Sequence, residues 1–107
     1  MTSQEFVIMQ TTTDTAEEAD RLAAAVVEQQ LAACVQVSQV TSYYRWQGEA
    51  QRDPEFLLAF KTTVSAMERV KEYLAANHSY EEPEVIVVPI VEGSRGYLQW
   101  MANSVSR

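Results

Sequence analysis

The stretch FVIMQTTTDTAEEADR, residues 6 to 21, decides the fold because it returns in a similar form fifty positions later, as FLLAFKTTVSAMERVK, residues 56 to 71. Each copy begins with an apolar run of strand length, residues 6–9 and 56–60, and continues into a polar helix start. The repeat predicts that both halves of the chain share one plan, in which a buried strand leads into a helix.

Both copies contain the spacing of a helix capping box, Thr15-x-x-Glu18 and Ser65-x-x-Glu68, in which the hydroxyl accepts a free backbone N–H and the glutamate bonds back to the cap residue. We expect the second helix to close near Asn77, because asparagine tolerates a left-handed turn. The apolar stripe of the first helix comprises Ala19, Leu22, Ala23, Val26, Val27 and Leu31. The thinner stripe of the second comprises Met67, Val70 and Leu74.

A strand is expected after each helix. The first, from about Ala33 to Arg45, is unusually long. The second, residues 85–91, is β-branched almost throughout, which predicts a central and covered strand. Between the long strand and the strand at residues 55–62, the segment WQGEAQRDP contains Gly48 and Asp53-Pro54, so we expect a hairpin with a wide tip.

The predicted order is therefore β-α-β-β-α-β, and a short helix around residues 94–102 follows it. This is the α+β, ferredoxin-like split-βαβ pattern, in one domain over residues 1–107. Both helices then cover the same face of a four-stranded antiparallel sheet. The other face stays bare although the chain has two tryptophans and five tyrosines, so we expect it to pack against another copy of the chain.

Composition excludes several classes of function. Fifteen acidic residues against eight basic ones give a net charge of −7, which disfavours nucleic acid as a partner. No apolar run reaches the roughly 18 residues of a membrane span, and the single cysteine favours a reducing, cytoplasmic setting. Neither a nucleophile–base pair nor a glycine-rich phosphate loop is present, so we expect neither an enzyme nor an organic cofactor.

Five motifs in order carry a resemblance to a known family: LAACVQV at 31–37, SYYRWQGE at 42–49, FKT at 60–62, NHSYEEPEVIVVPI at 77–90 and GYLQW at 96–100. Together they resemble the CutA family of divalent-cation tolerance proteins. The resemblance implies a homotrimer with hairpin arms that reach onto neighbours, an architecture like that of PII signalling proteins, a cytoplasmic location, and association with copper and other divalent cations. The family's typical motif is His-Pro-Tyr-Glu, and here Ser79 replaces the proline, which loosens the restraint on His78.

The candidate metal ligands are His78, Glu81 and Cys34, because imidazole, carboxylate and thiolate suit copper and other divalent ions. One chain supplies few ligands, so a neighbouring subunit would have to complete the site. The alternative is that His78 closes the second helix, that Glu81 is solvated and that Cys34 is a small buried hydrophobe.

A cleft between subunits could instead bind a small ligand, and its candidate residues are Lys61, Tyr44, Trp46, Tyr80 and Glu84. We expect Lys61 to pair with Glu81 or Glu84, and the alternative is a contact with an anionic ligand. The candidate trimer-interface residues are Tyr43, Arg45, Tyr97 and Trp100, because aromatic residues beside arginine anchor interfaces.

The leading hypothesis is a non-enzymatic, trimeric, copper- or divalent-cation-binding protein of metal tolerance. The alternative is a PII-like sensor that binds a small ligand between subunits. An enzyme that uses His78, Tyr80 and Lys61 as acid–base groups is a third reading, which no motif supports.

Overall fold

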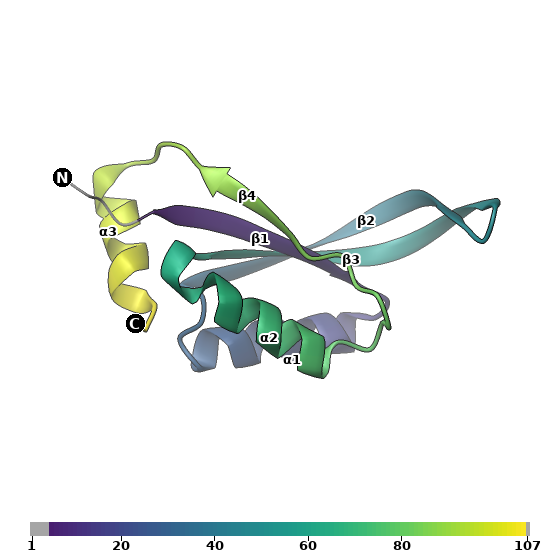
Figure 1. Cartoon of the computed structure of the whole chain (residues 1–107), viewed down its shortest axis with the longest axis horizontal. Coiled ribbons are helices and arrows are strands. Elements are labelled where there is room, and N and C mark those ends of the chain that lie inside the picture. The colour runs from purple at the N-terminus through teal and green to yellow at the C-terminus, as the bar shows by residue number, and fades with distance from the viewer. Residues whose placement is uncertain (1–4, 107) are drawn as a thin grey trace.

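The computed structural model describes residues 5–106 and confirms the expected α+β order. The elements, in chain order, are β1 (Phe6–Thr13), α1 (Ala16–Glu28), β2 (Cys34–Trp46), β3 (Glu49–Thr63), a 3-10 turn (Val64–Ala66), α2 (Met67–Asn77), β4 (Ile86–Ile90) and α3 (Arg95–Ser104). Figure 1 shows α1 and α2 side by side on one face of the sheet, with α3 at the end opposite the long β2–β3 hairpin. The whole is elongated, with extents of 49 × 25 × 21 Å.

The four strands form an antiparallel sheet in the order β2-β3-β1-β4. Strand β4 pairs only with β1, so it is an edge strand, and the prediction of a central and covered strand is wrong. Its side chains Ile86, Val87 and Val88 are exposed. β-branched residues favour a pleated, half-buried surface, but in the described part of the chain these side chains remain exposed.

The hydrophobic core lies between the sheet and the two helices. Strands β1 and β3 contribute side chains that alternate along the chain, as expected for one face of a pleated strand. Helices α1 and α2 contribute their apolar stripes. The core residues are Val7, Met9, Ala19, Leu22, Val26, Leu31, Ala32, Leu58, Phe60, Val70 and Leu74.

Of the two hydrogen bonds expected for the capping box of the first helix, only one is present. The Thr15 hydroxyl accepts a hydrogen bond from the Glu18 backbone N–H at 3.1 Å. The Glu18 carboxylate does not return to Thr15, and it accepts both Ser79 donors, from its backbone and its hydroxyl, instead. Helix α1 ends at Glu28. Two residues later Gln30 has a left-handed φ of 59°, and the Leu31 N–H donates to the Val26 carbonyl to close the turn.

The predicted start of the second helix is wrong, whereas its predicted end near Asn77 is confirmed, although without the expected left-handed turn. A 3-10 turn precedes α2, so Ser65 is not its cap residue, and the Ser65 hydroxyl shares a 3.1 Å hydrogen bond with Thr63. The cap position belongs to Ala66, which has no side chain able to accept. At the other end, Asn77 is helical and the chain leaves through His78 in an extended conformation, with no left-handed residue.

The expected wide hairpin tip is also wrong, because the β2–β3 ladder continues to Trp46 opposite Glu49. Only Gln47 and Gly48 turn the chain, with φ values of 52° and 82°. Two consecutive positive φ angles are those of a tight hairpin turn that matches the twist of its strands, and glycine adopts them at no steric cost.

The outer part of this hairpin stands apart from the rest of the sheet. The last β3 residue that pairs with β1 is Phe56, opposite Thr13. From the pair Val40–Glu55 outward, β2 and β3 have only each other. We call residues 40–55 the arm. Pro54 is accommodated in this part of β3 because one edge has no partner that needs an N–H.

The sheet face that points away from α1 and α2 remains largely uncovered by the described chain. Val7 and Met9 point into the core, so their β1 neighbours Ile8 and Gln10 point to the other face. Their partners across the ladder lie on that same face. We call it the open face, and its middle comprises Ile8, Gln10, Ile86, Val88, Lys61, Ala59, Cys34 and Gln36.

Candidate functional site

Polar side chains from α1, the arm and the connection between α2 and β4 meet a backbone carbonyl of β1 where the arm leaves the sheet. The connection begins at His78, and its first three residues each bind a different element. We call the group the arm-root cluster. It comprises Thr12, Glu18, Ser42, Glu55, His78, Ser79 and Tyr80.

His78 is the inner member of the cluster, and its side chain is only 1% exposed. Ring atom Nε2 lies 2.8 Å from the Thr12 carbonyl oxygen, to which only a protonated Nε2 can donate. Ring atom Nδ1 lies 3.0 Å from the Tyr80 backbone N–H and accepts from it. Both nitrogens are therefore used within the chain, and the neutral ring with its hydrogen on Nε2 satisfies both bonds.

Glu18 ties the connection to α1. Its two carboxylate oxygens each accept a hydrogen bond of 2.7 Å, one from the Ser79 N–H and one from the Ser79 hydroxyl. Desolvation opposes the charge on Glu18 and is the largest single influence. The two Ser79 hydrogen bonds and the nearby His78 and Arg21 together outweigh it and lower the pKa of Glu18 below its ordinary value of 4.5.

Tyr80 ties the connection to the arm. Its hydroxyl donates to Glu55 Oε2 at 2.7 Å, and the Ser42 hydroxyl donates to Glu55 Oε1 at 2.7 Å. Partial burial and the bond to Glu55 both raise the pKa of Tyr80 far above its usual range. The phenol therefore stays protonated and remains a donor at every physiological pH.

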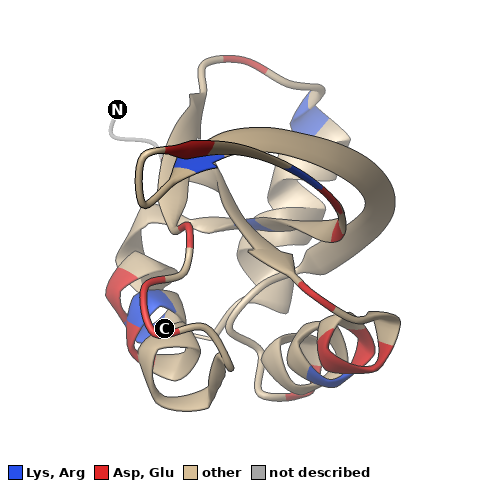
Figure 2. Cartoon of the chain, turned by 90° about the vertical axis from the view of Figure 1, so that its right-hand side faces the viewer, with Lys and Arg blue, Asp and Glu red and all other residues tan. Residues whose placement is uncertain are grey.

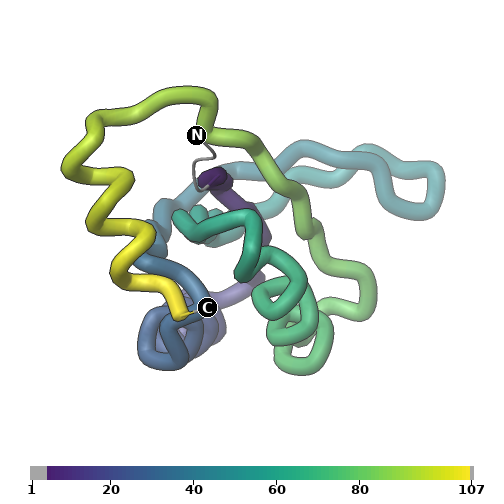
Figure 3. The backbone as a smooth tube through the Cα atoms, turned by 60° about the vertical axis from the view of Figure 1, so that its left-hand side comes forward, coloured from purple at the N-terminus to yellow at the C-terminus, as the bar shows by residue number. Residues whose placement is uncertain are grey.

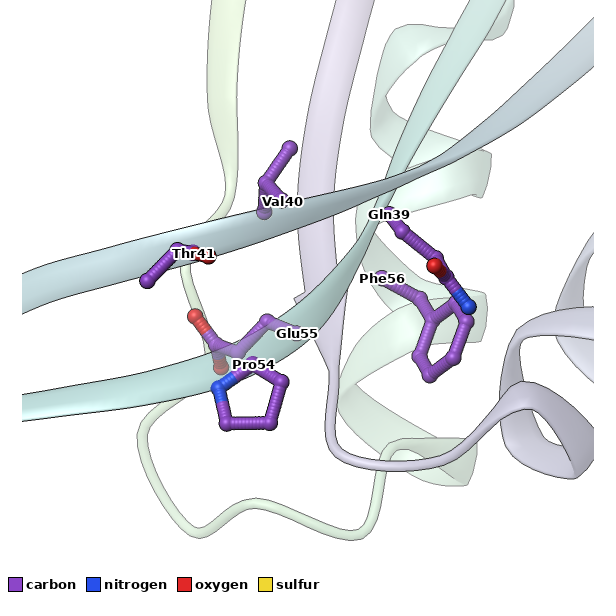
Figure 4. Close-up of a pocket in the computed structure, with 6 residues that line it drawn as sticks. All are labelled: Gln39, Val40, Thr41, Pro54, Glu55 and Phe56. Atoms are coloured by element: carbon purple, nitrogen blue, oxygen red, sulfur yellow. The ribbon is translucent and has the colours of Figure 1, made fainter.

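Further along the arm, Tyr44 donates to Asp53 Oδ2 at 2.6 Å. This hydrogen bond is the main reason that the pKa of Tyr44 is raised, and the charges of Asp53, Glu55 and Asp14 add to it. A shallow hollow of about 320 Å³ lies beside these groups, at the root of the arm. Figure 4 shows the six lining residues: Gln39, Val40, Thr41, Pro54, Glu55 and Phe56.

The three candidate metal ligands do not come together within residues 5–106, where no group of three His, Cys, Asp or Glu side chains could hold an ion. Cys34 lies opposite Lys61 and so at the level of Ile8 in β1, whereas His78 binds at Thr12. Four residues of strand separate those levels by roughly 13 Å. With both His78 nitrogens engaged and Glu81 exposed in solvent, this donor set does not fit a metal ion in a single chain.

The candidate cleft residues lie in separate parts of the chain. Tyr80 and Tyr44 face the carboxylates at the arm, whereas Trp46 lies at the arm's tip. The expected ion pair of Lys61 with Glu81 or Glu84 is wrong. In the described part of the chain no carboxylate pairs with the Lys61 ammonium, which lies 5.5 Å from the centre of the Tyr97 ring.

The candidate interface residues are accessible in the isolated chain. Tyr43 is 73% exposed on the arm, and its hydroxyl accepts from Arg52. Arg45 donates to the Gly48 carbonyl, which steadies the tip. Tyr97 and Trp100 lie with their rings 5.3 Å apart on α3, and both are exposed.

Sequence reasoning missed two central acids of the cluster. The sequence spacing assigns Glu18 to a helix cap, and only the fold shows that its carboxylate accepts hydrogen bonds from Ser79. Glu55 stands between Pro54 and the apolar run that starts at Phe56, so an acid at the entry of a buried strand was the available signal.

Comparison with known proteins gives one consistent result. The family model described as CutA1 divalent ion tolerance protein matches residues 7–104. The divalent-cation tolerance protein CutA of Thermus thermophilus is 48% identical over 82% of this chain and 86% of its own length. The chloroplastic protein CutA of Arabidopsis thaliana is 42% identical over 92% of this chain, which spans only 54% of that longer relative.

Solved structures show the same similarity in three dimensions. CutA from Synechococcus elongatus superposes with a TM-score of 0.93 at 37% identity, over 99% of this chain and 95% of the other. The periplasmic divalent cation tolerance protein CutA from Archaeoglobus fulgidus gives 0.91 at 31% identity, over 94% and 99%. In residues 5–106, no helix combines the length and the apolar character needed to cross a bilayer.

The Glu18–Ser79 bonds predict a distinct dependence of stability on pH. Because the folded pKa of Glu18 is lowered, its contribution is complete above the unfolded value near 4.5 and is lost as the pH falls through the folded value. Glu18→Gln should therefore lower the free energy of unfolding at pH 7 by about 1–3 kcal/mol. Urea denaturation of both proteins between pH 7 and pH 2.5, at one protein concentration, should show the gap shrinking below pH 4.5. A gap that stayed constant down to pH 2.5 would contradict this role of the carboxylate.

Proposed function

Because the chain belongs to the CutA1 divalent ion tolerance protein family, we propose that it acts in divalent-cation tolerance as a non-enzymatic homotrimer that binds copper or another divalent cation between its subunits. The single observation that carries the proposal is the open face, on which apolar side chains of β4 are exposed and those of β1 and β3 are only half-buried. Val88, for example, lies in the middle of β4 and is 41% exposed. Large uncovered apolar surfaces of this kind mark protein interfaces.

The edges of the sheet support self-association as well. Strands β2 and β4 are the two edges, and each leaves a row of backbone groups unpaired by any strand of residues 5–106. Edges of this kind recruit strands from other chains unless something blocks them. When two different edges of one chain meet head to tail, the contacts close a ring if the rotation between copies permits it.

The chemistry of the donor set favours a cation site between subunits over one inside the chain. His78 is committed to Thr12 and Tyr80. Accessible donors nearby include the exposed carboxylates of Glu81 and Glu84, and Cys34 is partly exposed. Ligands from two or three copies would be needed to reach the number that a divalent ion requires.

Partners and location follow as part of the same proposal. Basic and acidic positions lie next to one another on α1, on α2 and on the arm, an arrangement that does not favour nucleic-acid phosphates (Figure 2). We propose neither a membrane partner nor an organic cofactor. The proposed location is the cytoplasm, although relatives carry the names chloroplastic and periplasmic.

A charge on the open face should break the assembly. Val88→Asp places a carboxylate where we propose that a second chain packs, whereas Val27→Asp places one on α1 at nearly equal exposure, 41% against 42%. Sedimentation velocity should show a trimer for the wild type and Val27→Asp, and slower, smaller species for Val88→Asp. A well-folded wild-type monomer at micromolar concentration would contradict the proposed trimer.

Cation binding should not depend on the imidazole. Calorimetric titration with Cu(II) and with Zn(II) should give His78→Gln the wild-type affinity, because the ring nitrogens are already engaged. The double variant Glu81→Gln with Glu84→Gln should bind roughly tenfold more weakly or worse, since it loses accessible carboxylates. The opposite order of the two effects would place His78, and not the acids, at the cation.

A second candidate function, a PII-like sensor of a small ligand in the cleft between subunits, is favoured by Lys61. Lys61 is half-buried on the open face, its ammonium lies 5.5 Å from the centre of the Tyr97 ring, and within residues 5–106 no carboxylate forms an ion pair with it. An unpaired ammonium in such a position is stabilised when an anion binds beside it. The ligand class that this position suits is a small carboxylate or phosphate.

A thermal-shift screen of small carboxylates and nucleotides separates the two functions. A genuine ligand should raise the melting temperature of the wild type and of Lys71→Met, whose lysine pairs with Glu68 on the surface of α2. The same ligand should leave the melting temperature of Lys61→Met unchanged. Equal shifts in all three proteins would show that Lys61 makes no contact with it.

A further inference from the structure

Glu55 occupies a special place in the sheet. Its neighbour Phe56 is the last β3 residue that β1 supports, so Glu55 is the first residue of the arm on this strand. Across the ladder it faces Val40, where the arm begins on β2. Any swing of the arm relative to the body of the protein must therefore turn about the pair Val40–Glu55. Two-stranded ribbons without further support twist and bend easily.

The arm beyond that pair is stiff in itself. Tyr44 donates to Asp53, and Arg52 donates to Tyr43 while its guanidinium lies 5.6 Å from the centre of that ring. Ser42 donates across the ladder to Glu55. These cross-strand pairs lie on both faces of the ribbon, so the arm moves as one piece. Its tip lies about 20 Å from Glu55, at roughly 3.3 Å for each residue of strand.

The other side of the junction is also fixed. The Tyr80 backbone N–H donates to Nδ1 of His78. Ser79 donates two short hydrogen bonds to the carboxylate of Glu18 on α1. The His78 and Tyr80 rings lie 5.0 Å apart, which limits rotation of the phenol. The Tyr80 hydroxyl is thus carried by the body of the protein and not by the arm.

We propose that the Tyr80–Glu55 hydrogen bond is a latch that sets the direction of the arm. Within residues 5–106 it is the one side-chain hydrogen bond that joins the arm to the rest of the chain. The latch connects the α2–β4 connection to a tip 20 Å away, so a change at either place is felt at the other. It depends on hydrogen bonds of the described chain alone, and neither a bound cation nor a particular oligomer is needed for it.

The test measures the arm's direction in the full chain. Spin labels are placed at Gln47 in the tip and at Glu17 on α1, both exposed, on a Cys34→Ser background. Labelled protein is mixed with an excess of unlabelled protein, so that each measured distance lies within one chain. Tyr80→Phe removes only the hydroxyl, and Tyr97→Phe is the matched control because none of the hydrogen bonds described involves its hydroxyl. The Gln47–Glu17 distance distribution should broaden or shift in Tyr80→Phe and stay unchanged in Tyr97→Phe.

Hydrogen exchange supplies a second reading. Loss of a hydrogen bond to a charged acceptor should speed exchange of the backbone amides at residues 40–42 and at Glu55 and Phe56 by roughly tenfold in Tyr80→Phe. On a Ser42→Ala background Tyr80 is the one described partner left to the Glu55 carboxylate. There, adding Glu55→Leu to Tyr80→Phe should have little further effect, because both changes break the same bond. An unchanged distance distribution in a folded Tyr80→Phe protein would overturn the latch. Full additivity of the two substitutions would do the same.

Discussion

Strand β1 is eight residues long and strand β3 is fifteen, and much of the molecule follows from that mismatch. Where the two strands run together, both edges of β3 are paired and one of its faces packs against the helices, so the core forms there. Beyond Phe56 the ladder loses its central strand, and β2 and β3 must continue as a ribbon. The ribbon needs its own cross-strand bonds, a two-residue turn that suits its twist, and an anchor at its root. Tyr80 and Glu55 meet at that root.

The order of elements could be predicted because the signals that determine it lie within short stretches of the sequence. The repeat at 6–21 and 56–71, the stripe on α1 and the cap at Thr15 all depend on neighbours within a few residues. Errors arose where a distant segment competed. Glu18 has the spacing of a capping box, yet Ser79, sixty-one residues away, offers it two donors. The apolar run in β4 has the composition of a central strand, but composition does not say which chain provides the cover.

The candidate site shows the same division. His78 and Tyr80 stand out in the sequence as an imidazole and a phenol beside a turn, and both do belong to a polar cluster. Their partners, a backbone carbonyl of β1 and a carboxylate of β3, could not be deduced from spacing. The hydrogen bonds also alter the chemistry of the ring, because an imidazole that donates at one nitrogen and accepts at the other has no lone pair left for a metal. The chain belongs to a divalent ion tolerance family, yet no group of three His, Cys, Asp or Glu side chains within residues 5–106 could hold an ion.

The two tryptophans lie at opposite ends of this 49 Å molecule, Trp46 at the tip of the arm and Trp100 on α3. They are 60% and 44% exposed in the single chain, so both indoles would fluoresce as solvated chromophores. Burial of either end against another chain would shift its emission to the blue. The protein therefore carries its own pair of optical reporters, one on the arm and one on the C-terminal helix.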